Sequence, residues 1–444
     1  MTFCRGQTMR KAPLFAATGL LLASSLALAQ TPYTEDSTYR GLGGKEGIRK
    51  ITDTFLELVL ADPRIKDNFA DFDIPQINQR LQEQFCEYAG GPCKYSGKYR
   101  DKTMDGTGTV RDMKSVHIDL KITDAMFNAL AEDLQLAMER HGVSTYVSNK
   151  LVAKLAPMHR DIVTASAPPA PARPDRGRFL ATGGVSTVEG AGGGGITPWA
   201  LITGYGTRDS WGGNVHYTRV QTQDYSLGTY GVAVGVADRL ELSVARQDFQ
   251  GDLAPLNLLR IKQDILGLKV KLAGDAVYDQ DRPMPQVALG IMYKKNKGIG
   301  GLGALGVTNV KQLGAKDDRG YDYYLSATKV CLEHSLLVNG TLRATKANQM
   351  GILGFGGDKG DHVKLQPEVS VAWLAHRTLA IGAEYRRKPH NLGVDPEKAY
   401  YDVFAAWFPT KNVSVTAAYA NLGTITIFNP KTQKGWYLSL QAGI

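Results

Sequence analysis

One histidine has a residue type and surroundings that suit metal chemistry. His117 lies in DMKSVHIDLKITDAMF, between an apolar-periodic stretch and the start of a helix. An imidazole in such a place is either a structural side chain or a ligand that binds iron through one ring nitrogen. No pairs of histidine or cysteine occur at zinc spacing, and no nucleophile is arranged beside a base. The sequence therefore offers one candidate metal ligand and no motif for hydrolytic chemistry.

The segment around His117 is predicted to be helical from its hydrophobic spacing. Ile48, Ile51, Phe55 and Leu58 recur on one face of a helix that Asp62-Pro63 should end. The same spacing predicts helices in IPQINQRLQEQFCEYAGG and TDAMFNALAEDLQLAMERHG, and a further helix over about 144–163. These helices predict a small all-α domain over residues 30–163.

The second half of the chain follows a period of two. TYGVAVGVADRLELSVARQDF alternates apolar residues with small or polar ones, and so do NVSVTAAYA and GWYLSLQAGI. Roughly 12 to 14 such segments of about ten residues occur, the length that a tilted membrane strand needs. We therefore expect an all-β antiparallel barrel of outer-membrane type over residues 178–444. A large soluble β-sandwich or barrel is the alternative, because alternation in a single strand is a weak signal.

Two further segments divide the chain. TASAPPAPARPDRG, residues 164–177, is too rich in Pro, Ala and Arg to bury a core and is predicted to be an extended linker. At the N-terminus, Arg10 and Lys11 precede an apolar run that closes with Ala27-Leu28-Ala29. This pattern predicts a signal peptide over residues 1–29, with a membrane anchor as the alternative. We therefore expect export to the periplasm and the outer membrane.

Charge and cysteine usage fit an exported protein. Residues 31–163 carry a net charge of −2, so no nucleic-acid partner is expected. Residues 164–444 carry +8, which suits lipid head groups or simply a mildly basic surface. An oxidising compartment would permit a bridge between Cys86 and Cys93, although their spacing alone does not establish it.

Several short motifs together resemble the group I truncated haemoglobins over residues 37–163. They are the start Leu42-Gly43-Gly44, VLADP, the phenylalanine at position 69, GGPCKYSG and the spacing from His117 to ITDAMF. The resemblance implies a b-type haem with its iron bound by His117, wedged by Phe69, with Arg80 pairing with a propionate. It also implies cofactor contacts from Leu56, Phe55, Ile77, Leu81, Phe85 and Met113.

The sequence departs from this family on the side where the gas would bind. The family often has tyrosine at the position of Leu56 and a polar residue at Ile77 or Leu81, whereas all three are aliphatic here. A lost hydrogen bond of this kind is worth ~1–3 kcal/mol. Dioxygen should therefore be held less tightly than in tyrosine-bearing relatives, while carbon monoxide and nitric oxide depend less on such donors.

An insertion before His117 is the second departure. Residues 98–116 are longer than the family pattern and could bring Lys98, Tyr99 or Met104 over the haem as a donor or a sixth ligand. A surface loop is the alternative, because the segment is rich in Gly, Thr and Asp.

The β half is similar to an uncharacterised proteobacterial family of exported proteins. The similarity lies in LEHSLLVNGTLRATKANQMGILGFGGD, AIGAEYRRKPHNLGV and FNPKTQKGWYLSLQAG, and it implies no known chemistry. The glycine-rich GAGGGGITPW is not a phosphate loop, because it lacks the Gly-Lys-Ser/Thr signature and a strand-to-helix setting.

The expected protein is a periplasmic haem globin tethered to an outer-membrane barrel, more a gas-binding haemoprotein than an enzyme. It should bind dioxygen, nitric oxide or carbon monoxide in carriage, delivery or sensing, with outer-membrane lipid around the barrel. One rival is nitric oxide dioxygenation or peroxidase-like detoxification, which would need an unidentified reductase. Another is solute transport through the barrel, with the globin as a plug or a haem-trafficking module.

Overall fold

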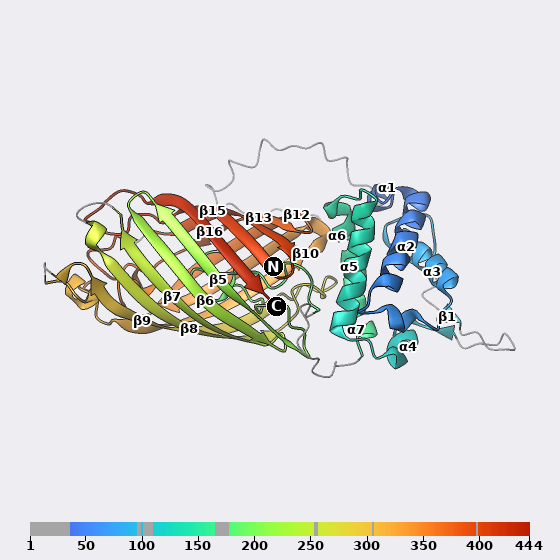
Figure 1. The fold of residues 1–444 in the computed structure, drawn as a ribbon, viewed down its shortest axis with the longest axis horizontal. Helices are drawn as coiled ribbons and strands as arrows, with labels where there is room; N and C mark the ends of the chain where they lie inside the picture. The colour runs from blue at the N-terminus through green and yellow to red at the C-terminus, as the bar shows by residue number, and fades with distance from the viewer. Residues whose placement is uncertain are drawn as a thin grey trace, which may run out of the picture.

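The chain folds into a helical part and a β-barrel, placed end to end (Figure 1). The computed structural model describes residues 36–95, 99–100, 110–164, 177–252, 256–303, 306–396 and 398–444. The expected signal peptide, residues 1–29, lies outside the described residues, as does nearly all of the expected linker. None of the described helices has both the length and the apolar composition needed to cross a bilayer.

The helical part contains the three long helices that the sequence predicts. They are α2 (Gly44–Ala61), α3 (Ile74–Tyr88) and α5 (Asp124–Arg140). The short helices α1 (Ser37–Gly41) and α4 (Met113–His117) precede α2 and α5. The helix expected over 144–163 is divided into α6 (Thr145–Leu155), a 3-10 turn (Ala156–Met158) and α7 (His159–Ile162). The single-helix prediction was wrong here because Pro157 has no N–H to donate within a helix.

The core of the helical part lies between α2, α3 and α5. Ile48, Ile51 and Phe55 are buried as their spacing predicts, whereas Leu58 is only partly buried. A disulfide joins Cys86 at the end of α3 to Cys93, with their Cα atoms 5.8 Å apart. The bridge ties the segment after α3 to the helix that carries much of the predicted pocket.

The β half forms a closed antiparallel barrel of twelve strands, which confirms the predicted fold class. Each strand pairs with its neighbour in sequence, and the last strand pairs with the first, so the barrel has no free edge. The strands are β5 (Trp211–Thr222), β6 (Tyr225–Val236), β7 (Leu240–Gly251), β8 (Arg260–Ala273), β9 (Gln286–Gly300), β10 (Arg319–Cys331), β11 (Leu336–Thr345), β12 (Lys364–His376), β13 (Leu379–Arg386), β14 (Tyr400–Thr410), β15 (Val413–Asn421) and β16 (Lys434–Gly443).

The outward face of the barrel is apolar, with aromatic residues near both ends. Exposed Val and Leu side chains alternate with buried polar ones along each strand, as in β12. Exposed aromatics near the end that faces the helices are Trp211, Trp373 and Trp407, and those near the far end include Tyr321, Tyr323, Tyr385, Tyr401, Tyr419 and Trp436. An apolar band between two aromatic girdles is the surface that outer-membrane barrels present to lipid.

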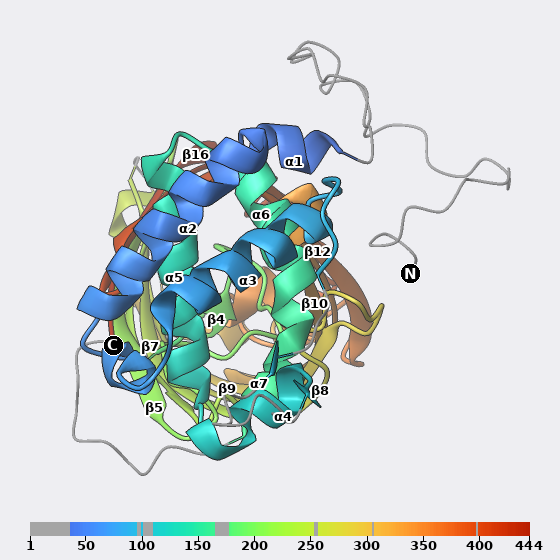
Figure 2. The same ribbon diagram turned by 90° about the vertical axis from the view of Figure 1, so that its right-hand side faces the viewer.

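The two ends of the barrel differ in the length of their connections. The connections at the end near the helices are mostly short, spanning residues 237–239, 332–335, 377–378 and 411–412, with one longer loop over 274–285. The far end carries the longer connections 301–318, 346–363, 387–399 and 422–433. The helical part lies across the short-turn end, as the view along the barrel shows (Figure 2).

A segment that precedes the first barrel strand fills part of the barrel interior. Residues 178–206 include the short strands β3 (Val185–Ser186) and β4 (Gly192–Gly193), and most of their side chains are buried. The Glu189 carboxylate contacts Lys294, Arg343 and Arg386 of the barrel wall. We call residues 178–206 the inner segment.

The glycine-rich motif GAGGGGITPW lies in the inner segment, where its backbone runs close to the barrel wall. A Cβ atom on Gly194 would lie 2.0 Å from the carboxylate of Glu384, which accepts hydrogen bonds from the Ile196 N–H (2.8 Å) and the Thr197 hydroxyl (2.5 Å). Glycine is therefore needed for the backbone to approach the wall closely.

Candidate haem site

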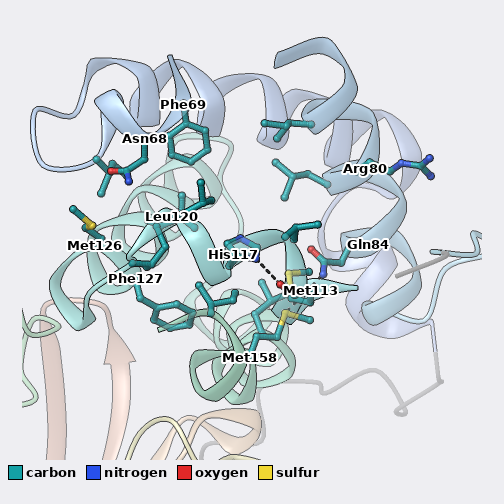
Figure 3. A pocket seen from close by; sticks show the side chains of 18 of the residues that line it. Asn68, Phe69, Arg80, Gln84, Met113, His117, Leu120, Met126, Phe127 and Met158 are labelled. Carbon is teal, nitrogen blue, oxygen red and sulfur yellow. Dashed lines mark hydrogen bonds between the residues drawn. The ribbon is translucent and has the colours of Figure 1, made fainter. Parts of the chain in front are cut away.

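A cavity of about 390 Å³ lies inside the helical part, between α2, α3, α4 and α5. Its size is within the range of small-molecule sites. All nine residues that the sequence predicts as cofactor contacts line it: His117, Phe69, Arg80, Leu56, Phe55, Ile77, Leu81, Phe85 and Met113. The structure therefore brings together side chains spread over more than sixty positions, and their roles toward a cofactor remain predictions (Figure 3).

The short helix α4 positions His117. Asp112 caps the helix by accepting the Ser115 N–H (2.8 Å), and the Ser115 hydroxyl oxygen in turn accepts the Asp112 N–H (2.9 Å). Such a reciprocal cap fixes where a helix begins. His117 is the last residue of α4, so the cap also helps to fix where along the cavity wall its ring lies.

The hydrogen bonding of His117 selects one tautomer. Its Nδ1–H donates to the carbonyl oxygen of Met113 at 2.7 Å (Figure 3). Because a carbonyl only accepts, the proton lies on Nδ1 and the Nε2 lone pair is left available. Burial lowers the pKa of His117, against the effect of the Met113 carbonyl. The imidazole is therefore neutral at neutral pH, which is the form that binds a metal.

The walls of the cavity are apolar and largely aromatic. Phe55, Leu56 and Phe85 are almost fully buried, and Phe69 packs against the same core. Arg80 lies at the rim, where its guanidinium contacts Glu83 at 3.0 Å and points away from the cavity (Figure 3). The body of a flat apolar cofactor would thus be enclosed by apolar walls, and Arg80 would have to turn from Glu83 to reach a charged edge of it.

Sequence reasoning missed several polar residues that line this cavity, among them Asn68, Tyr95 and the deeply buried Gln84. Gln84 is 5% exposed, lines the cavity from α3, and directs its amide N–H to the sulfur of Met158 at 3.7 Å. A sulfur atom is a weak acceptor, and Gln84 also makes a side-chain hydrogen bond with Tyr88. The helical spacing from Ile77 and Leu81 could have placed residue 84 on the same face.

The insertion before His117 is described only in part. Tyr99–Arg100 (β1) pairs with Val110–Arg111 (β2) as a two-stranded ribbon leading into α4. Lys98 and Met104, which we considered as groups over the haem, lie outside the described residues. The side chain of Tyr99 is not described either.

Comparison with known proteins agrees with this two-part division. The family model described as "Bacterial-like globin" matches residues 37–164, and the model "Protein of unknown function (DUF3034)" matches residues 182–441. The chain belongs to the DUF3034 family and carries a group 1 truncated haemoglobin domain. Haem with iron is the cofactor of truncated haemoglobins, and the domain supports haem-based gas binding.

The curated relatives align with the globin domain over most of their own length. The chain is 33% identical over 132 residues to group 1 truncated hemoglobin GlbN of Synechocystis sp., covering 28% of this chain and 95% of that protein. It is 27% identical to GlbN of Mycolicibacterium paratuberculosis, covering 30% of this chain and 87% of that protein.

Solved structures match each part separately. Truncated hemoglobin from Tetrahymena pyriformis in the Fe(III) form matches with a TM-score of 0.25 at 23% identity, covering 28% of this chain and 97% of that chain. The KdgM porin matches with a TM-score of 0.33 at 8% identity, covering 52% of this chain and 98% of that chain.

Proposed function

We propose that this protein reversibly binds a diatomic gas at a haem whose iron is held by Nε2 of His117. The observation that carries the proposal is the single neutral imidazole with its free nitrogen at an apolar cavity, its other nitrogen fixed by the Met113 carbonyl. A bound haem would supply the iron to which the gas attaches. The chain supplies the imidazole, the apolar enclosure that excludes water, and Arg80 at the rim.

The proposed ligand set is dioxygen, nitric oxide or carbon monoxide, with dioxygen held weakly. Leu56, Ile77 and Leu81, the positions at which the family often has donors, offer none, and the Gln84 N–H is directed at the Met158 sulfur. A weakly held gas suits delivery or sensing better than storage. Steady detoxification would require electrons from a separate reductase.

We further propose that the barrel anchors the globin to the inner face of the outer membrane. Its apolar band and two aromatic girdles support a lipid-facing barrel. In such barrels the short turns face the periplasm and the long loops face outward. The globin lies at the short-turn end, which supports a periplasmic location.

The inner segment favours an anchor over an open solute channel. It places buried ion pairs and hydrogen bonds across the barrel interior, among them Glu189 with Arg386 and Trp199 with Ser370 (3.0 Å). Opening a path would require these buried charges to separate, which is costly. The transport alternative would therefore need the inner segment to move.

The decisive experiment is the absorption spectrum of the full-length protein in detergent, loaded with haem. Wild type should show a Soret band that shifts on reduction and again with carbon monoxide. His117→Gly should lose or alter the band, and added imidazole should restore it by occupying the vacated position. A wild-type protein without a Soret band, or a His117→Gly spectrum equal to that of the wild type, would contradict the proposal.

A further inference from the structure

A second cavity lies where the globin meets the barrel. Its volume is about 130 Å³, and it is enclosed by α5 and α6 of the globin, by the inner segment and by the barrel end. The barrel side contributes mainly apolar groups, including Leu337, Leu374, Ala380 and Phe408, and the inner segment contributes Phe179 and Leu201. Because the barrel supplies part of its wall, a globin alone could not form this cavity.

The two cavities share one wall. Phe127, Ala131 and Leu134 of α5, together with Leu155, line both the haem cavity and the second cavity. Residues 127, 131 and 134 form one stripe along the helix. The partition is thus one helix thick, and its middle position carries the smallest of the four side chains.

Ala131 is the position at which side-chain atoms separate the two cavities least, because alanine ends at its Cβ. This alanine keeps part of its surface accessible although it lies within the docked interface, whereas Leu134 beside it is buried. Ala380 on the opposite side of the second cavity also keeps accessible surface. Both residues line the second cavity and are not fully enclosed by packed atoms.

The chemistry of the second cavity suits a small apolar solute. An apolar cavity of roughly 150 Å³ stays dry and takes up xenon or benzene. Two of its polar residues bond elsewhere: Asn149 donates to Ser335 at 3.1 Å and Arg377 to Glu139 at 2.9 Å, and most of the other lining residues are apolar. Dioxygen, nitric oxide and carbon monoxide are smaller than xenon or benzene and similarly apolar.

The second cavity also lies at the level of a membrane girdle. Leu374 and Phe408 follow directly after Trp373 and Trp407, and consecutive residues of a strand point to opposite faces. Apolar solutes favour hydrocarbon over water. Gas dissolved in the bilayer would therefore be concentrated close to this end of the barrel.

We propose that the cavity between globin and barrel is a second binding site for apolar gas, which exchanges gas with the haem cavity past Ala131. This inference rests on the proposed gas-binding function and adds the site from which the gas arrives. The barrel then serves as more than an anchor, since it forms one half of the gas site.

The test uses the full-length protein and fills the second cavity from the barrel side. Ala380→Leu places a larger side chain in the cavity, and Ala383→Leu is the matched control, because residue 383 lies on the same strand with its side chain exposed. Ala131→Leu approaches from the globin side, so a folding failure of one variant leaves the other as a test. Xenon-pressurised crystals report occupancy, and carbon monoxide photolysis of the haem-loaded protein reports exchange.

The expected result is xenon in the second cavity of the wild type and Ala383→Leu, and its loss in Ala380→Leu. Photolysis of the wild type should show a second, slower phase of geminate rebinding from gas that has crossed the partition. Ala380→Leu and Ala131→Leu should lose that phase, and Ala383→Leu should keep it.

Two results would overturn the inference: no xenon in the wild-type cavity, or identical rebinding in all four proteins despite xenon binding. Failure of the proposed function would look different. The wild type would then lack a Soret band, while the xenon measurement would still decide whether the cavity accepts gas.

Discussion

The docking of the globin on the barrel should depend on Asp124. This residue begins α5 and is 5% exposed. It accepts hydrogen bonds from His159 Nε2 at 2.7 Å and from two nitrogens of Arg208, each at 2.7 Å. Arg208 lies just before the first barrel strand, and His159 stacks on Tyr278 of the 274–285 loop with ring centres 3.9 Å apart. One carboxylate thus links two helices to the barrel end.

The free-energy cost of replacing Asp124 follows from how deeply it and its partners are buried. Burial opposes the ionisation of Asp124, but the hydrogen bonds from His159 and Arg208 outweigh it and hold its pKa well below the usual range. Removing one member of a buried ion pair costs about 3–5 kcal/mol. The Arg208 side chain is 60% exposed and can return to water, so we discount the cost of Asp124→Asn to about 2 kcal/mol. That cost corresponds to about 30-fold weaker docking.

Hydrogen exchange of the full-length protein measures this opening directly, because exchange of interface amides reports the free energy of local opening. Asp124→Asn should speed exchange in α7 and in residues 274–285 by about 30-fold. Asp161→Asn is the control, since this aspartate is exposed on α7. Equal protection in Asp124→Asn and the wild type would refute the assignment. Because the pKa is lowered in the docked state, the contribution should persist at neutral pH and fade only below pH ~4.

Three further predictions concern the haem cavity, the globin core and the barrel interior. Leu56→Tyr should slow dioxygen dissociation by about tenfold or more relative to Leu56→Phe, because only tyrosine adds a donor; stopped-flow release with carbon monoxide measures this, and equal rates would argue against it. Burial, with a contribution from Asp62, raises the pKa of Asp133 to about 6. Its neutral form therefore stabilises the globin below pH ~4, and this contribution is lost as pH rises through 6. Asp133→Asn should then raise stability at pH 8 by about 1–2 kcal/mol and little at pH 4 in thermal unfolding; an equal gain at both would contradict it. Glu189→Gln should destabilise the barrel by about 3–5 kcal/mol, because Lys294 and Arg386 lose a buried counter-charge. The measurement is the temperature at which the band of the folded barrel shifts to that of the unfolded chain on a gel, and an unchanged temperature would count against the prediction.

The fold could be predicted from the sequence wherever apolar residues recur at a spacing that places them on one face of a helix or strand. Ile48, Ile51 and Phe55 follow the helical period and are buried in α2, and the period of two gave the barrel class and an estimate that includes its twelve strands. Pro157 divided the last helix because one residue without an N–H outweighs an apolar pattern.

The site was less predictable in its polar details. A family pattern placed His117 and its apolar neighbours around one cavity, but it said nothing of Gln84, whose position depends on how α3 faces Met158. The inner segment was not predicted from the sequence either. Its glycines are explained only by contact with a wall residue such as Glu384, almost two hundred positions away. Contacts of that separation leave no local period in the sequence.

One buried residue of the globin bonds both to the residue that precedes the inner segment and to the barrel end. Asn128, fully buried on α5, donates to the carbonyl oxygen of Gly177 at 2.7 Å and accepts from the hydroxyl of Tyr278 at 2.7 Å. Its neighbour Phe127 lines the haem cavity. One turn of α5 therefore contacts the haem cavity, the residue that precedes the inner segment and the barrel end. A globin loosely tethered by a linker would not need such buried polar contacts, which cost stability unless every partner is in place. These buried contacts therefore argue that the globin is docked on the barrel in one fixed arrangement, and is not merely held nearby by the linker.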